Sequence, residues 1–280
     1  MVITPFDEVK KKISKKIPIE LLGYLPNKWE KIGDVLIIKI PSKLFTYKEI
    51  VAENYSKVLN CKTVLGDFGG ISGVYREPNV EILWGSKDTE TIHLENGIRY
   101  KLDPRKIMFS SGNMDERIRM ASISNYDETV VDLFAGIGYF TLPIAVYCKP
   151  KKIFSCELNP IAFRYLSDNI VLNDVTSVVK PLLGDNKVNA PKNVADRVIL
   201  GYFKNNHKFL QTAIDGLKNN CGILHYHDLS PDDSIPNKSL NLLNGSIKKY
   251  NRRLEVLNVK HVKSYAPGIS HIVLDVEIGI

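Results

Sequence analysis

The amino-acid sequence predicts an α/β protein: a Rossmann-like sheet of mainly parallel strands that ends in an antiparallel hairpin, preceded by a smaller α+β domain. Two observations carry this prediction. After Met120, strand-length and helix-length apolar runs alternate, which is typical of a parallel sheet covered by helices on both faces. The last two apolar runs are instead both β-rich and are joined by a short Pro-Gly loop, which predicts the terminal hairpin.

The composition is that of an ordinary globular chain with an excess of positive charge. Its 280 residues are enough for two unequal domains, which we expect at residues 1–105 and 106–280. Lys and Arg outnumber Asp and Glu by 38 to 31, and the net charge of +7 suits a polyanionic partner such as nucleic acid. We expect a monomer.

Neither targeting nor metal signals stand out. The N-terminus is rich in lysine and lacks the apolar core of a signal peptide. The stretch Val130–Cys148 is about as long as a membrane span, but two glycines and a proline break it, so a strand followed by a helix explains it better. The four cysteines form no Cys-x-x-Cys pair, which argues against structural zinc and disulfides. A reduced, cytoplasmic setting without metal is expected.

The first 105 residues predict a small α+β unit. Residues 4–17 predict an amphipathic helix with Thr4 as its cap, and its five lysines form either a solvated face or a patch that contacts RNA. The pair Asn96-Gly97 lies between alternating residues, which predicts a tight hairpin. The other expected elements are strands at 34–40, 63–65 and 80–83 and a helix at about 47–59.

The second domain contains the alternating strands and helices. Strands are expected at 129–134, 152–156, 177–182, 195–200 and 221–226. Helices are expected at about 138–147, 160–172 and 206–218. The hairpin strands are Leu254–Val262 and Ile269–Ile278. An antiparallel hairpin at the end of a parallel sheet is the arrangement of Rossmann-like, class I S-adenosylmethionine (SAM) transferases.

The ends of the first three strands of this domain predict a cofactor site, because open parallel sheets bind ligands there. The first strand ends in a tight turn with Gly136 and Gly138, where backbone can approach a ligand. Glu157 ends the second strand and is placed to accept hydrogen bonds from both ribose hydroxyls of an adenosine. Asp185 and Asn186 follow the third strand and suit an adenine edge with its amino group.

The glycine turn by itself is compatible with either NAD or SAM as the cofactor. NAD enzymes commonly have a third glycine where this chain has Thr141, so the complete set of groups favours SAM. Asp132 is interpreted as a structural acid that supports the turn rather than as a ligand-binding residue.

A second anion-binding signal lies upstream, where a Ser-, Gly- and Asn-containing loop opens a helix at about Met114. Arg117, one turn inside, could bind a carboxylate such as that of the SAM methionine tail. The alternative is a domain-linking helix with surface arginines.

Three segments together resemble one superfamily: Phe68–Arg76, Phe109–Arg119, and the run from Asp132 to Gly138 with Glu157–Pro160. It contains the archaeal-eukaryal tRNA guanine-37 N1-methyltransferases and their relatives in wybutosine synthesis. The resemblance covers about residues 60 to 275. Two departures from the methyltransferases favour the wybutosine branch, the aminocarboxypropyltransferases. Asp196–Phe203 has no Asn-Pro-Pro-like motif, and Phe109–Asn113 stands where Phe-Ser-Pro-Arg is usual.

The resemblance implies an unusual use of SAM. C7 of 4-demethylwyosine at position 37 of tRNA(Phe) attacks the methylene carbon of the methionine arm, and 5′-methylthioadenosine leaves. It implies that Ser110 and Arg117 hold the methionine end, Glu157 the ribose, and Asp185 with Asn186 the adenine.

No catalytic base is evident. Arg76, His225 and His227 are conceivable, but a satisfied core or surface position explains either histidine better. Tyr202 and Phe203 either stack on the base or fill a strand-end core position, and Arg76 is a further candidate substrate contact. The alternatives are a guanine-37 N1-methyltransferase and a tRNA-binding protein with an inactive cofactor fold.

Overall fold

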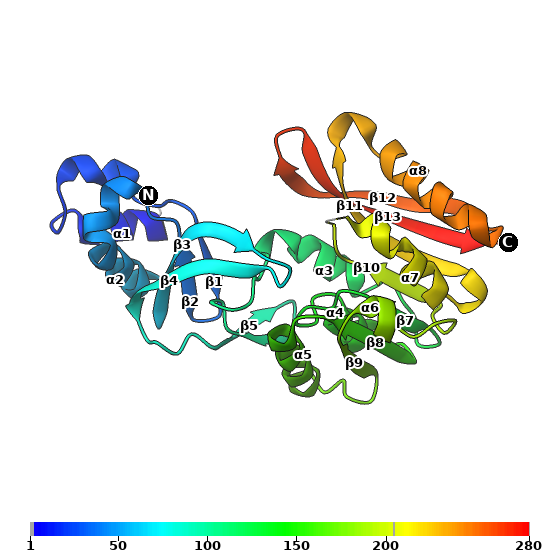
Figure 1. Cartoon of the computed structure of the whole chain (residues 1–280). Coiled ribbons are helices and arrows are strands. Elements are labelled where there is room, and N and C mark those ends of the chain that lie inside the picture. Colours follow the sequence, from blue (N-terminus) through cyan, green and yellow to red (C-terminus); the bar gives the residue numbers. More distant parts are fainter. Residues whose placement is uncertain (1–2, 204, 280) are drawn as a thin grey trace. The chain divides into compact units, whose positions relative to one another are not determined.

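The computed structural model describes residues 3–203 and 205–279 (Figure 1). The chain divides into two compact units, which are described separately. The first consists of Met1–Glu95 and Arg99–Ser111, and the second of Asn96–Ile98 and Gly112–Ile280. Within the described residues, no helix is both long and apolar enough to cross a membrane.

A four-stranded sheet with two helices forms the first unit. The helices are α1 (Pro5–Ile13) and α2 (Lys48–Leu59), with 3-10 turns η1 (Ile19–Tyr24) and η2 (Ser42–Tyr47). The strands are β1 (Trp29–Ile32), β2 (Val35–Ile38), β3 (Thr63–Ser72) and β4 (Glu77–Gly85), in that spatial order. Strands β2 and β3 pair in parallel, with α2 between them in sequence, and the other pairs are antiparallel.

Helix α1 is shorter than the expected 4–17. Thr4 caps it as predicted: its hydroxyl accepts from the Asp7 N–H, and the Asp7 carboxylate accepts from the Thr4 N–H. The helix ends at Ile13, and Ser14 is its C-cap, yet Ile17 beyond it is still buried. The apolar residues keep their helical spacing into the turn before Pro18. For this reason the sequence alone predicted a longer helix.

Asn96-Gly97 forms a tight turn, as expected. It joins β5 (Thr91–Glu95) to β6 (Ile98–Leu102), which make a two-stranded sheet. Both turn residues have positive φ, 47° and 75°, as this kind of turn requires.

A seven-stranded sheet forms the second unit, in the order β12-β13-β11-β10-β7-β8-β9. The parallel strands are β7 (Thr129–Asp132), β8 (Lys152–Glu157), β9 (Val179–Leu183), β10 (Arg197–Leu200) and β11 (Gly222–Pro231). Strand β13 (Ile269–Gly279) pairs antiparallel with β11 and with β12 (Arg253–Ala266). The expected class I fold with its terminal hairpin is confirmed.

Helices cover both faces of this sheet (Figure 1). One core cluster joins α7 (Leu210–Gly216) and α8 (Asn237–Ile247) to apolar residues of β10, β11 and β13. On the other face, Asp275 of β13 contacts α3 (Met114–Met120), and Asp132 of β7 and Ser155 of β8 contact α4 (Thr141–Pro143). Two further helices are α5 (Pro160–Leu172) and α6 (Asn186–Asn189).

Several elements of this unit differ from expectation. The helix expected at 138–147 begins at Thr141 and continues as a π-helical turn, η4 (Ile144–Cys148). Strand β11 runs five residues past the expected end at 226, because β13 pairs with it as far as Pro231. Helix α8 was missed, since its sequence is rich in Asn and Ser and contains a glycine.

Candidate active site

The glycine turn after β7 has the conformation that a close backbone approach needs. Gly136 and Gly138 have φ of +59° and +103°. A Cβ on Gly136 would lie 2.6 Å from the Tyr139 ring, and one on Gly138 would lie 2.7 Å from the Leu142 side chain. Positive φ and crowding together favour glycine at both positions.

Asp132, at the end of β7, holds this turn in place. It is fully buried, and its carboxylate accepts hydrogen bonds from the Phe134 N–H (3.2 Å) and the Thr141 hydroxyl (2.8 Å). The Thr141 hydroxyl also lies 2.9 Å from that of Ser155 on β8. Burial raises the pKa of Asp132 to about 6. These contacts support the interpretation of Asp132 as a structural acid.

Glu157 ends β8 beside the glycine turn. One carboxylate oxygen accepts from the Gly136 N–H and the other from the Asn159 N–H, both at 2.7 Å. Burial raises the pKa of Glu157, while the backbone N–H donors at Asn159 and Gly136 lower it. Each oxygen keeps a lone pair for another donor. The residue is thus fixed in orientation and still able to accept from two neighbouring hydroxyls.

Asp185 and Asn186 lie next, after β9. Asp185 is exposed and caps α6 by accepting from the Lys187 N–H at 2.9 Å. Asn186 is buried, and its amide nitrogen donates to the Leu133 carbonyl at 2.7 Å. Its amide oxygen is buried without a hydrogen-bond partner among the residues that the structure describes. A buried acceptor of this kind calls for a ligand donor such as an exocyclic amino group.

Arg117 of helix α3 is buried, unlike a surface arginine. Arg117 is 2% exposed. Its neighbour Arg119 lies 2.6 Å from both Glu116 and Asp275 of β13, so that arginine is committed to holding α3 on the sheet. Ser110, the other candidate for the methionine end, belongs to the first compact unit, whereas Arg117 belongs to the second.

Aromatic rings gather where β10 ends. Tyr202 stacks on Phe134 with ring centroids 5.0 Å apart and an interplanar angle of 19°. Phe203 lies nearly parallel to Tyr202, at 6.5 Å and 14°. Both Tyr202 and Phe203 are partly exposed, so part of each side chain is accessible. Arg76, the third candidate substrate contact, lies in the β3–β4 turn of the first unit with φ of +56°.

Histidines line β11 and β13 close to these rings. His225 is fully partnered: Arg197 donates to its Nε2 (2.7 Å), so its Nδ1 carries the proton donated to Asp275 (2.5 Å). This confirms the satisfied core position expected for His225. His227 and His271 are also buried, and His227 Nδ1 lies 3.1 Å from His271 Nε2. Sequence reasoning missed His271, although a histidine inside the apolar run Ile269–Val273 was a usable signal.

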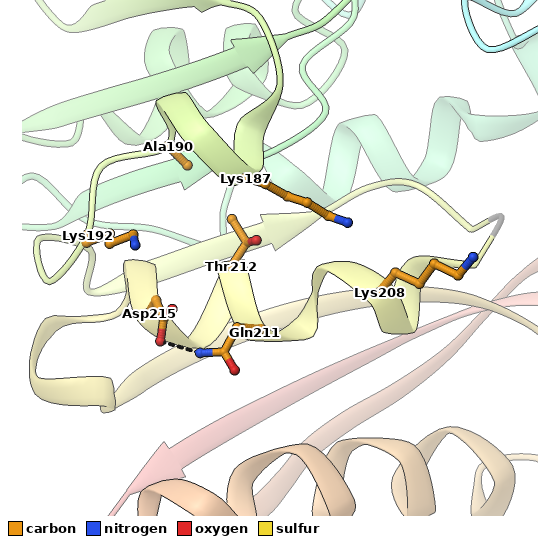
Figure 2. A pocket seen from close by; sticks show the side chains of 7 residues that line it. All are labelled: Lys187, Ala190, Lys192, Lys208, Gln211, Thr212 and Asp215. Atoms are coloured by element: carbon orange, nitrogen blue, oxygen red, sulfur yellow. Dashed lines mark hydrogen bonds between the residues drawn. The ribbon is translucent and has the colours of Figure 1, made fainter.

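A separate cavity of about 280 Å³ lies between α6 and α7. Lysines from α6, from the loop that follows it and from the 3-10 turn η5 (Asn206–Phe209) line it, together with side chains of α7 (Figure 2). The lining residues are Lys187, Ala190, Lys192, Lys208, Gln211, Thr212 and Asp215. Neither Glu157 nor Asn186 is among them, so this cavity is distinct from the proposed adenosine site. Among the described residues, no three His, Cys, Asp or Glu side chains group as metal ligands.

Family models match both parts of the chain. Residues 91–257 match the TRM5/TYW2 methyltransferase domain, and residues 9–89 match the TYW2 N-terminal domain. The fold and the glycine-turn site define a class I transferase of the SAM-dependent type. The chain belongs to the TRM5/TYW2 family.

Among curated relatives, the tRNA(Phe) (4-demethylwyosine(37)-C(7)) aminocarboxypropyltransferase of Pyrococcus horikoshii is 43% identical over 270 residues, 96% of each chain. The enzyme of the same name from Methanocaldococcus jannaschii is 45% identical over 89% of this chain and 96% of its own. The tRNA (guanine(37)-N(1))-methyltransferase Trm5b of Pyrococcus abyssi is 36% identical, over 94% of this chain and 78% of its own.

Solved structures agree with these sequence matches. P. horikoshii TYW2 in complex with MeSAdo has a TM-score of 0.88 and 41% identity, covering 98% of this chain and 99% of that one. M. jannaschii TYW2 in complex with AdoMet has a TM-score of 0.75 and 40% identity over 90% of this chain and 99% of that one. The complex of aTrm5 and tRNALeu has a TM-score of 0.82 and 32% identity, covering 99% and 79%.

Proposed function

We propose that this chain transfers the 3-amino-3-carboxypropyl group of SAM to C7 of 4-demethylwyosine at position 37 of tRNA(Phe), releasing 5′-methylthioadenosine. The observation that carries this proposal is the 43% identity, over nearly the whole of both chains, to an enzyme named for that reaction. The segment after β10, Leu200-Gly201-Tyr202-Phe203, lacks the Asn-Pro-Pro-like motif expected of the N1-methyltransferases and supports the same choice.

The residues present fit SAM as the donor substrate. Gly136 and Gly138 let the turn approach it, and the two oxygens of Glu157 accept from the ribose hydroxyls. The unpartnered Asn186 oxygen accepts from the adenine amino group, with exposed Asp185 beside it. We assign Arg117 to the methionine end, where a guanidinium suits a carboxylate, and Ser110 is a further candidate contact.

Bound SAM supplies three electrophilic carbons on one sulfonium, so placement decides which of them reacts. In this assignment the chain fixes the adenosine through Glu157 and Asn186, and Arg117 fixes the arm. Tyr202 and Phe203 offer the target base a stacking surface beside the arm, as unstacked bases favour aromatic platforms. Arg76 is a further candidate contact to the RNA.

The test is incubation of the protein and 4-demethylwyosine-containing tRNA(Phe) with SAM labelled either in the carboxyl group or in the methyl group. We expect the carboxyl label to reach the tRNA and the methyl label to leave in 5′-methylthioadenosine. A methyl label on the tRNA would instead identify an N1-methyltransferase. Neither label on the tRNA, with SAM and tRNA still bound, would identify a tRNA-binding protein with an inactive cofactor fold.

Three further points belong to the proposal. The RNA contact is the anticodon region, because position 37 lies there, and the first compact unit is assigned to tRNA contact. The chain acts as a monomer, which equilibrium sedimentation at working concentration tests. The location is the cytoplasm, where its tRNA substrate is found.

A further inference from the structure

Two buried histidines at the carboxyl edge of the main sheet have no part in the reaction as described so far. His227 of β11 and His271 of β13 are 0% and 1% exposed. His227 Nδ1 and His271 Nε2 share one hydrogen bond of 3.1 Å. Their outer nitrogens, His227 Nε2 and His271 Nδ1, are buried without a hydrogen-bond partner among the described residues. Buried polar atoms without partners are rare in proteins and call for an explanation.

The pair is well placed for the chemistry. Leu200, the last residue of β10, pairs with Tyr226, so His227 is the first residue of β11 beyond that end. The His271 ring centroid is 5.2 Å from that of Phe203, and the His227 ring centroid is 5.0 Å from that of Phe140. Phe203 belongs to the proposed stacking surface, and Phe140 lies two residues after Gly138 of the glycine turn. The pair thus lies between the two segments assigned to the base and to SAM.

Proton counting gives the pair two equivalent states. Burial, reinforced by the neighbouring charges, lowers the pKa of each ring to about 3, so both are neutral near pH 7. If His271 Nε2–H donates to His227, then His271 Nδ1 is a free acceptor and His227 Nε2 carries a proton. If His227 donates instead, the two outer nitrogens exchange these roles. A proton taken up at one end is therefore matched by one released at the other, without a net charge remaining on the pair.

We propose that this pair removes the C7 proton, with His271 as the base and His227 as the positioning residue that holds His271 and passes a proton on. The inference rests on the proposed function. C7 forms a bond to the methylene carbon of the arm, and the electrons of the broken carbon–sulfur bond leave with 5′-methylthioadenosine. The C7–H electrons then return to the ring as the proton passes to His271 Nδ1. The Nε2 proton of His271 moves to His227 Nδ1, and the Nε2 proton of His227 passes to solvent when the site opens for product release.

A weakly basic acceptor is sufficient here, because the ring that has gained a carbon at C7 is cationic and readily loses a proton. A neutral acceptor also adds no positive charge near the sulfonium. Phe203 covers His271 but is itself partly exposed, so a shift of this ring when the base stacks opens the His271 end.

The experiment compares His271→Asn, His227→Asn and the control His261→Asn, an exposed histidine on β12. Substrates are tRNA(Phe) with hydrogen or deuterium at C7 of 4-demethylwyosine. For His271→Asn we expect kcat to fall about 100-fold, the scale of general base catalysis, with SAM and tRNA affinities kept. The C7 deuterium isotope effect should rise, since proton loss becomes rate-limiting, and imidazole should partly restore the rate of His271→Ala. The fall in kcat should be smaller for His227→Asn, and kcat should be unchanged for His261→Asn.

The wild-type protein provides a measurement that does not depend on a variant folding. Nitrogen-15 NMR of labelled histidines should show both rings neutral at pH 7, with His227 and His271 exchanging between two tautomers. Rings held in one fixed tautomer, or a His271→Asn rate within about twofold of wild type with an unchanged isotope effect, would overturn the inference. A wild-type protein that does not transfer the carboxyl-labelled arm would overturn the proposed function instead, so the two failures are distinguishable.

Discussion

At the residue scale, the geometry of Glu157 explains why a carboxylate is needed at the end of β8. Both of its oxygens accept from backbone N–H groups, those of Gly136 and Asn159, at 2.7 Å. A glutamine would turn an NH₂ group against one of these donors. The residue type is therefore fixed by the turn as well as by the ligand, and Gln is no conservative substitute here.

We expect Glu157→Ala and Glu157→Gln each to weaken SAM binding by about 10- to 100-fold, because a hydrogen bond to a charged group contributes about 1.5–3 kcal/mol. The affinity for tRNA should stay nearly unchanged. Isothermal titration with SAM and filter binding of tRNA measure the two, and Glu255→Gln on exposed β12 is the control. Wild-type SAM affinity in Glu157→Ala would remove the ribose assignment.

Asp132 carries a pH dependence of stability whose sign follows from its raised pKa. The pKa of about 6 in the folded protein lies above the ordinary value of 3.8, since burial disfavours the charged form. Between these values the unfolded chain has already lost the proton that the folded protein keeps, so the free energy of unfolding falls as pH rises. The Asp132 contribution is fully present below pH 3.8 and is lost by about pH 6.

Asp132→Asn removes this dependence and keeps the shape, since an amide can accept from Phe134 N–H and donate to the Thr141 hydroxyl. We expect the unfolding free energy of wild type, relative to Asp132→Asn, to drop by about 2 kcal/mol between pH 4 and pH 7. Urea unfolding at several pH values measures it, with Asp127→Asn, an exposed acid, as the control. A constant difference across this range would show that Asp132 has no raised pKa.

At the element scale, α3 is a short helix fixed by charge. Glu116 is fully buried, and it lies 2.6 Å from Arg119 and 3.3 Å from Lys260 of β12. Arg119 also pairs with Asp275. Burial would raise the pKa of Asp275, but the hydrogen bond with His225 and the charge of Arg119 hold this pKa below its usual range. This network orients α3 on the sheet and so sets the position of Arg117.

Arg117→Ala should weaken SAM binding more than it weakens 5′-methylthioadenosine binding, because the latter lacks the carboxylate that we assign to this guanidinium. We expect the loss of affinity for SAM to exceed the loss for 5′-methylthioadenosine by about tenfold or more, which corresponds to one charge-assisted hydrogen bond. Isothermal titration with both ligands measures this, and a thermal melt checks that the buried substitution leaves the fold intact. Equal losses for the two ligands would show that Arg117 does not hold the methionine tail.

Elements with a clear period and chemical boundaries could be predicted from the sequence. Helix α5 matches its expected limits because Asn159 caps it and Pro160 starts it, and Asn96-Gly97 marked its turn. The same reasoning missed α8, whose polar composition conceals an apolar face on the sheet. It also missed the His227–His271 contact, because two residues 44 positions apart meet through the antiparallel register of β11 and β13.

At the scale of the whole molecule, a net charge of +7 predicts affinity for tRNA but not where the charge acts. Two lysine groups allow a comparison at equal charge. Lys10, Lys11 and Lys15 lie exposed on and just after α1, as both interpretations of these lysines require. Lys187, Lys192 and Lys208 instead line the cavity between α6 and α7 (Figure 2).

We expect the triple Gln variant of Lys187, Lys192 and Lys208 to weaken tRNA binding more than the matched variant of Lys10, Lys11 and Lys15. A concave surface with low-dielectric walls concentrates the potential of its charges, whereas an exposed helix face is screened by salt. Filter binding between about 50 and 200 mM salt measures it, because the slope of log K against log salt becomes shallower by about 0.7–0.9 for every phosphate that is no longer neutralised by a lysine. An equal reduction of affinity in the two variants would mean that total charge alone sets tRNA binding.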